Sequence, residues 1–187
     1  MPPAGAERAT PLAVGVVLWL ASEVMFFGGL FAAWFTLKAH NEPNWPPAGE
    51  EIDAVRMAIF TAVLISSSFT IHFAVSAAER GNRSSSIRWL ALTIILGLAF
   101  LLNEGFEWAG LPFGFDASAF STIFYLLTGF HGAHVLGGLL IMTTVGWVVF
   151  SRNSKVPKAE SLRITSYYWH FVDVVWVILF FVVYVIQ

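Results

Sequence analysis

Five long apolar stretches divide this chain, and most of its charged residues lie between them. They run over residues 12–37, 54–78, 87–108, 117–150 and 164–186. A helix needs about 20 apolar residues to cross the hydrocarbon core of a bilayer, so each stretch is long enough to span it. The pattern predicts an all-α fold: a polytopic bundle of five transmembrane helices over residues 12–187, preceded by a short cytoplasmic segment, 1–11. The first stretch lacks a signal-peptide cleavage site, and we expect it to be retained.

The links between the stretches predict how the helices are oriented, because Lys and Arg are retained on the cytoplasmic side. The link between spans three and four has no Lys or Arg, and the first link has only Lys38 and Arg56 among several acids. The other two links are basic, with Arg80, Arg83, Arg88, Arg152, Lys155, Lys158 and Arg163. We therefore expect a protein of the cell membrane with its N-terminus in the cytoplasm and its C-terminus outside.

Composition excludes several classes of function. The chain is 57% hydrophobic and 12% charged, with a formal net charge of -2 and no basic tail. This argues against nucleic acid as a partner, because neutralising phosphates requires clustered Lys and Arg. The absence of Cys excludes disulfides, thiolate zinc sites, iron–sulfur clusters and Cys-bridged copper centres.

Four ionisable side chains are expected in the inner half of the membrane. A charged residue at mid-bilayer costs on the order of 2.5 to 3.5 kcal/mol, so each one needs a partner or a function. At about 1.5 Å per residue, Glu23 and Asp173 lie at similar depth and His72 and His170 lie nearer the cytoplasm. We expect these four to form an inner polar cluster if the helix arrangement brings them together. His170 and Asp173 share a helix face, which indicates a hydrogen-bonded or salt-bridged lock between helices, with a proton relay as the alternative.

Glu104, Glu107, His131 and His134 form a second group, in the outer half. The two histidines lie three residues apart in the motif GFHGAH, and the simplest interpretation is interhelical hydrogen bonding, to Glu104 or Glu107. Metal ligation is the alternative. Di-iron bundles use a Glu-x-x-His motif on two helices, and this sequence does not contain that motif.

Glu23 differs from the other acids because its helix neighbours supply no polar partner. Trp19, Leu20, Phe26 and Phe27 surround it along the first span, and desolvation favours the neutral acid. A functional role and a structural hydrogen bond both remain open for this residue.

Small residues at four-residue spacing predict where helices pack closely, since helix contacts in membranes depend on close backbone approach. The pairs Gly28 with Ala32 and Gly29 with Ala33 lie in the first span. The series Gly129, Ala133 and Gly137 lies in the fourth. We expect both sets to mark helix-packing seams.

Three motifs together resemble one known family. They are WLASEVMFFGGLFAAWF in the first span, TGFHGAHVLGG in the fourth and YYWHFVDVVWVILFFVVYV in the last. In order and spacing they are similar to subunit III of cytochrome c oxidases, in the haem–copper oxidase family, and the resemblance runs from about Leu12 to Ile186. The long form of this family has seven helices. This chain resembles the last five, the short form, without the two helices that form the other wall of a lipid cleft.

The resemblance implies an accessory subunit of a proton-pumping terminal oxidase, with no catalytic residue, metal or redox cofactor on this chain. Haem and copper would be carried by partner subunits, and the expected partners are catalytic subunit I, subunit II and membrane phospholipid. In the family, the glutamate that matches Glu23 reacts with hydrophobic carbodiimide, and the subunit is thought to sustain proton uptake and protect the enzyme during turnover. His134 and Arg152 are similar to family residues that contact lipid headgroups.

Two other functions compete with this interpretation. A related subunit of a quinol oxidase, or the protein that accompanies nitric oxide reductase, would have a similar sequence, although YYWHFVDVVW favours the cytochrome c branch. An independent proton or small-molecule transporter could use the same intramembrane acids and histidines. The inverted repeats and interrupted helices typical of transporters are not found in the sequence.

Overall fold

The computed structural model describes residues 11–50, 52, 54–151 and 157–186. Within these ranges every regular element is helical, and five helices are long and apolar enough to cross a membrane. They are α1 (Pro11–Asn41), α2 (Ala54–Glu79), α3 (Arg83–Gly110), α4 (Ala119–Val149) and α5 (Lys158–Phe180), which runs on into the π-helical turn η1 (Phe181–Val185). The predicted all-α class and five spans are confirmed.

Polar caps, and not the limits of the apolar stretches, determine where α3 and α4 begin. The Asn82 side chain accepts a hydrogen bond from the backbone N–H of Ser85 at 3.1 Å, so α3 begins at Arg83 and not at Ile87. Ser118 and Ser121 form a reciprocal capping box at the start of α4, with distances of 3.0 and 2.8 Å. The basic link between α2 and α3 is therefore shorter than the sequence pattern indicates, because the Asn82 cap starts α3 early.

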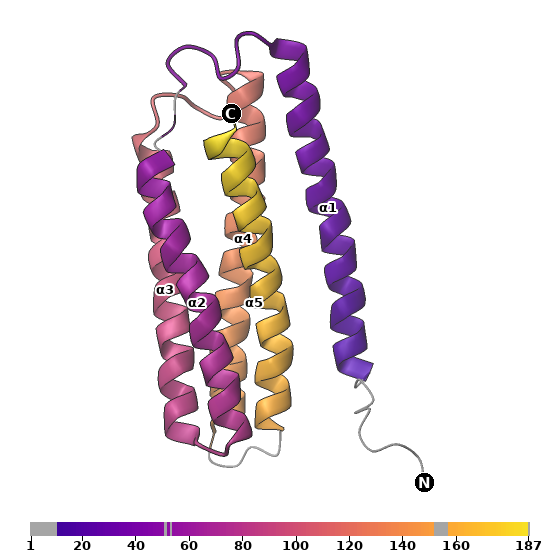
Figure 1. The fold of residues 1–187 in the computed structure, drawn as a ribbon, viewed down its shortest axis with the longest axis vertical. Helices are drawn as coiled ribbons and strands as arrows, with labels where there is room; N and C mark the ends of the chain where they lie inside the picture. The colour runs from indigo at the N-terminus through magenta and orange to yellow at the C-terminus, as the bar shows by residue number, and fades with distance from the viewer. Residues whose placement is uncertain (1–10, 51, 53, 152–156, 187) are drawn as a thin grey trace.

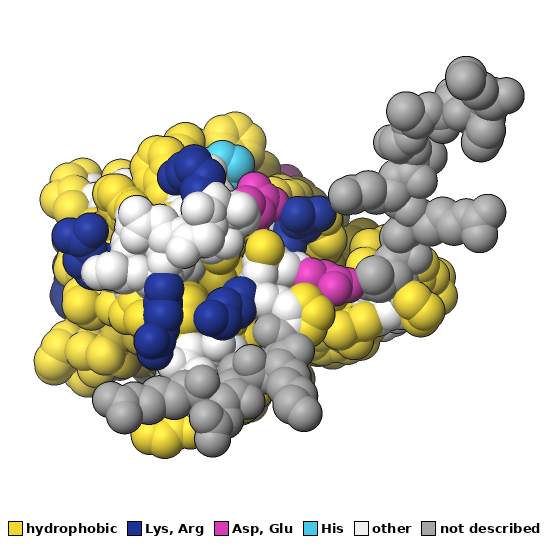
Figure 2. Space-filling model, turned by 90° about the horizontal axis from the view of Figure 1, so that it is seen from below, with side chains coloured by type: hydrophobic (Ala, Val, Ile, Leu, Met, Phe, Trp, Pro, Cys, Tyr) yellow, Lys and Arg dark blue, Asp and Glu magenta, His cyan; other side chains and the backbone are white. Residues whose placement is uncertain are grey.

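Helices α2 to α5 form an antiparallel bundle, and α1 lies beside it against α4 and α5 (Figure 1). Only Phe27 and Trp34 of α1 are buried. The α2–α3 link, the end of α4 and the start of α5 lie at the same end of the bundle as the start of α1 (Figure 1). Figure 2 shows Lys and Arg side chains gathered on that end, as the charge pattern of the links predicted.

Trp169 of α5 occupies the centre of the bundle. Its fully buried indole lies between Gly97 of α3 and Gly138 of α4, where an added Cβ would come within 2.7 and 2.8 Å of the ring. The indole N–H donates to Ser67 Oγ of α2 at 2.8 Å. This one side chain therefore contacts all three other helices of the bundle, and it fits only because two neighbours lack a side chain.

The predicted glycine seams are only partly right. A Cβ at Gly129 or Gly137 would meet Trp108 at 3.1 Å or Tyr168 at 3.3 Å, so both glycines face neighbouring helices. The tightest sites on α4 are Gly132, Gly138 and Gly146, which the four-residue spacing did not select. A Cβ at Gly28 or Gly29 would meet nothing within 4 Å, so the α1 seam is not used against the described part of this chain.

We expect Gly138→Ala to destabilise the bundle, because its Cβ would lie 2.8 Å from two ring carbons of a side chain that has no room to move. Overpacking of this kind typically costs about 1 to 3 kcal/mol. The control is Gly28→Ala, which adds the same methyl group to a helix in open space and should be neutral or stabilising. Thermal unfolding of the two purified variants in detergent would test this, and equal midpoints would contradict it.

Candidate functional site

Glu23 of α1 pairs with His134 of α4. Glu23 Oε2 lies 3.2 Å from His134 Nε2, and the two side chains are 20% and 17% exposed. The other ring nitrogen of His134, Nδ1, lies 2.6 Å from the backbone carbonyl of Phe130. A carbonyl oxygen only accepts hydrogen bonds, so Nδ1 carries a proton. The Glu23 contact is therefore either a neutral acid donating to a neutral imidazole or an ion pair.

Aromatic rings enclose this pair and attach α1 to the bundle. The His134 ring packs edge-on against Phe27, with centroids 5.0 Å apart. The Tyr168 hydroxyl donates to the His134 carbonyl at 3.0 Å, and its ring stacks on Trp19 at 5.2 Å. The pair thus lies in apolar surroundings at the α1–α4 contact.

A second polar group joins α2 to α5. Ser68 Oγ contacts both His170 Nδ1, at 2.9 Å, and Asp173 Oδ2. Ser68 donates its one hydroxyl proton to Asp173, so His170 Nδ1 is the donor in the other contact. The three residues form a line of hydrogen bonds from His170 through Ser68 to Asp173. Ser68 was not selected from the sequence, although it lies in the run Ser66–Ser68 one helical turn before His72.

The prediction that Glu23, His72, His170 and Asp173 form one inner cluster is therefore wrong, because only His170 and Asp173 come together. Glu23 lies on a different helix contact, and the His72 side chain is exposed on α2, where its ring packs against the adjacent Phe73. Counting residues along a helix gives depth in the membrane but not direction around the bundle. Because α1 packs on α4 and α5, Glu23 meets the histidine of α4.

The outer group also differs from its prediction, because neither histidine bonds to Glu104 or Glu107. Glu107 Oε2 accepts from the buried Tyr184 hydroxyl at 2.9 Å. Both carboxyl oxygens of Glu104 and both ring nitrogens of His131 are buried without a hydrogen-bond partner among the described residues.

The surroundings of Glu104 and His131 explain this separation. Glu104 packs on Gly132, where a Cβ would lie 2.8 Å from its carboxyl oxygen. The His131 ring packs against Trp176 and Phe100 with centroids 4.7 and 5.9 Å away. Each polar group is therefore held by packing against apolar neighbours.

No group of three or more His, Asp or Glu side chains that could hold a metal ion occurs in the described part of the chain. Arg152, selected from the sequence as a headgroup contact, lies outside the described residues. The arrangement offers paired acid and imidazole groups within a membrane bundle.

Comparisons with known proteins agree with one another. The family model described as cytochrome c oxidase subunit III matches residues 6–187. A probable cytochrome c oxidase subunit 3 of Mycobacterium tuberculosis is 42% identical over 186 residues, covering 97% of this chain and 91% of that protein. Cytochrome c oxidase subunit 3 of Corynebacterium diphtheriae is 40% identical, with 98% and 92% covered. The subunit of Thermostichus vulcanus is 37% identical, with 92% and 86% covered.

We expect Asp173→Ala to weaken the α2–α5 contact by about 1 to 3 kcal/mol, because Ser68 then loses its buried acceptor. Asp173→Asn is the matched control, since its amide oxygen still accepts from Ser68. The measurement is the yield of folded, monodisperse protein and its thermal midpoint in detergent. If the two variants behave alike, the hydrogen-bond line does not stabilise the bundle.

Proposed function

The chain belongs to the cytochrome c oxidase subunit III family, and we propose that it is an accessory subunit, without redox centres, of a proton-pumping haem–copper oxidase. Its partners in that complex would be catalytic subunit I, which it packs against, and subunit II. The electron-transfer chemistry and its haem and copper would then belong to the other subunits. The relatives named above support this proposal because they match nearly the whole chain.

The observation that carries the proposal is the polar character of one outer face at membrane depth. On this face, formed by α2 and α5, His72 is exposed. A groove of about 310 Å³ beside it contains Ser68, His170 and Asp173, with apolar walls that include Ile65 and Val177. Asp173 Oδ1 has no hydrogen-bond partner among the described residues. Ionisable side chains rarely face lipid, so this face favours a covering protein subunit.

We further propose that Glu23 is the carboxyl that supports proton uptake and reacts with carbodiimide, as the family resemblance implies. Its setting supports this role, since a partly exposed acid is paired with a histidine among aromatic rings. The role of His134 and Arg152 in holding lipid headgroups is part of the same proposal. The same proposal includes an orientation in which the end of the molecule that carries the Lys and Arg side chains in Figure 2 faces the cytoplasm.

Purifying the tagged chain from its own membrane in mild detergent should yield larger subunits and a haem absorption spectrum. His72→Ala should lower the haem recovered per chain by about fivefold, which corresponds to roughly 1 kcal/mol of interface free energy. His40→Ala removes the same ring from the exposed end of α1 and should have no effect. A functional chain isolated without haem would rule out the accessory role and favour a transporter. Equal haem recovery in the two variants would place the interface elsewhere.

Glu23→Gln should leave the complex intact but abolish labelling of the chain by dicyclohexylcarbodiimide. The glutamine amide can still donate to His134 Nε2, so α1 should remain attached. Glu104→Gln is the matched control, because its carboxyl is also intramembrane but is sealed against Gly132. Peptide mapping by mass spectrometry would locate the label. Labelling that survives Glu23→Gln, or collapse of the complex, would reject the proposed role of this carboxyl.

A further inference from the structure

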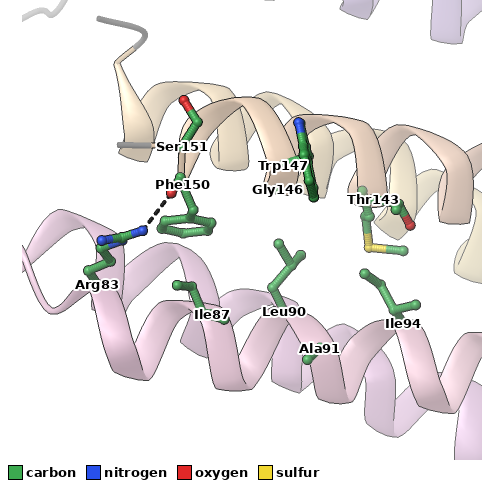
Figure 3. A pocket seen from close by; sticks show the side chains of 11 residues that line it. Arg83, Ile87, Leu90, Ala91, Ile94, Thr143, Gly146, Trp147, Phe150 and Ser151 are labelled. Atoms are coloured by element: carbon green, nitrogen blue, oxygen red, sulfur yellow. Dashed lines mark hydrogen bonds between the residues drawn. The ribbon is translucent and has the colours of Figure 1, made fainter. Parts of the chain in front are cut away.

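An apolar groove of about 520 Å³ runs between α3 and α4 at the basic end of the bundle. Figure 3 shows Ile87, Leu90 and Ile94 of α3 opposite Trp147 of α4. Met142 of α4 also lines the groove. Trp147 is 83% exposed, so nothing in the described chain covers the outer wall. At Gly146 the two helices approach closely, since a Cβ there would lie 2.9 Å from Leu90 Cδ2.

Arg83 lies at the mouth of this groove. Its guanidinium donates to the Phe150 carbonyl at 2.5 Å, the interaction drawn in Figure 3. A guanidinium has five N–H donors arranged to bind carboxylate or phosphate, and among the described residues the Arg83 guanidinium donates only to that carbonyl. Its side chain is exposed on the end of the molecule where Figure 2 shows other Lys and Arg residues.

Below its mouth the groove offers a bound molecule no free side-chain hydrogen-bond donor. Thr143, the polar side chain inside it, donates to the carbonyl of Leu139 on its own helix at 2.7 Å. The groove therefore combines a cationic mouth with a long apolar interior. The α2–α5 face differs, because its polar groups lie at membrane depth.

We propose that this α3–α4 groove binds one glycerophospholipid with an anionic headgroup. Its phosphate pairs with Arg83, and one acyl chain lies along Leu90, Ile94 and Met142. The order of charge and apolar surface matches a lipid, whose phosphate lies at the membrane surface and whose chain lies below it. The site is separate from His134, which points toward α1, whereas Gly146 on the same helix faces α3. This inference goes beyond the accessory role, and it rests on that role only in that its test uses the assembled complex.

The test uses the purified complex in phosphatidylcholine vesicles that contain a trace of phosphatidylglycerol with a photoreactive acyl chain. We expect the label on peptides that contain Leu90, Ile94 and Met142. Arg83→Gln should reduce it by about tenfold, because a charge-assisted hydrogen bond is lost. Arg88→Gln removes another exposed arginine of α3, one that lines a different pocket, and labelling should change less than about twofold.

A second variant tests the apolar half of the site. Ala91 lines the groove with an exposed methyl group, so Ala91→Phe should fill it and remove the label without disturbing the buried packing. The haem content of each variant is measured in parallel, so that loss of the complex is distinguished from loss of lipid.

Three outcomes would overturn the proposal. Equal labelling by photoreactive phosphatidylcholine would show that the groove holds bulk lipid without selectivity for charge. Equal losses in Arg83→Gln and Arg88→Gln would show that the headgroup does not depend on Arg83. Cross-linking of the groove to another subunit would show that a protein helix covers it.

Discussion

The contact between α5 and its three bundle neighbours is the constraint on which the rest of the structure depends. Trp169 fits between Gly97 and Gly138 and bonds to Ser67, while Trp176 donates to Thr61 of α2 at 2.9 Å. In lipid, helices associate through close packing and interhelical hydrogen bonds. The hydrophobic effect does not drive this association, because lipid tails are as apolar as the side chains that become buried. These contacts determine how α5 is rotated in the bundle. They therefore determine where His170, Asp173 and Tyr168 point.

Two of the intramembrane polar groups lie at helix contacts on different sides of the bundle. Ser68, His170 and Asp173 lie on the α2–α5 contact and border a groove on the outer surface. Glu23 and His134 lie where α1 meets α4, on another side of the bundle. One set thus faces a surface suited to a protein partner. The Glu23–His134 pair holds the peripheral helix α1 against α4. A change in the protonation of this pair would therefore alter how strongly α1 is attached.

Charge and apolar surface are also separated along the membrane normal. Arg83 and other described Lys and Arg residues lie at one end, while the α3–α4 groove has mainly apolar walls. The lipid that we propose for this chain would be held by charge at the membrane surface and by shape below it. The α3–α4 groove joins both features at Arg83 and Gly146.

The sequence by itself determined the helical class, the five spans and the identity of the intramembrane acids and histidines, because hydrophobic length and the cost of burying charge act locally. The motifs around Glu23, His134 and Asp173 also indicated the family. Only the tertiary structure decided which groups meet. The pairing of Glu23 with His134, the role of Ser68 and the isolation of His131 depend on how each helix is rotated. That rotation is set by a few close contacts, such as Trp169 against two glycines, between residues far apart in the sequence.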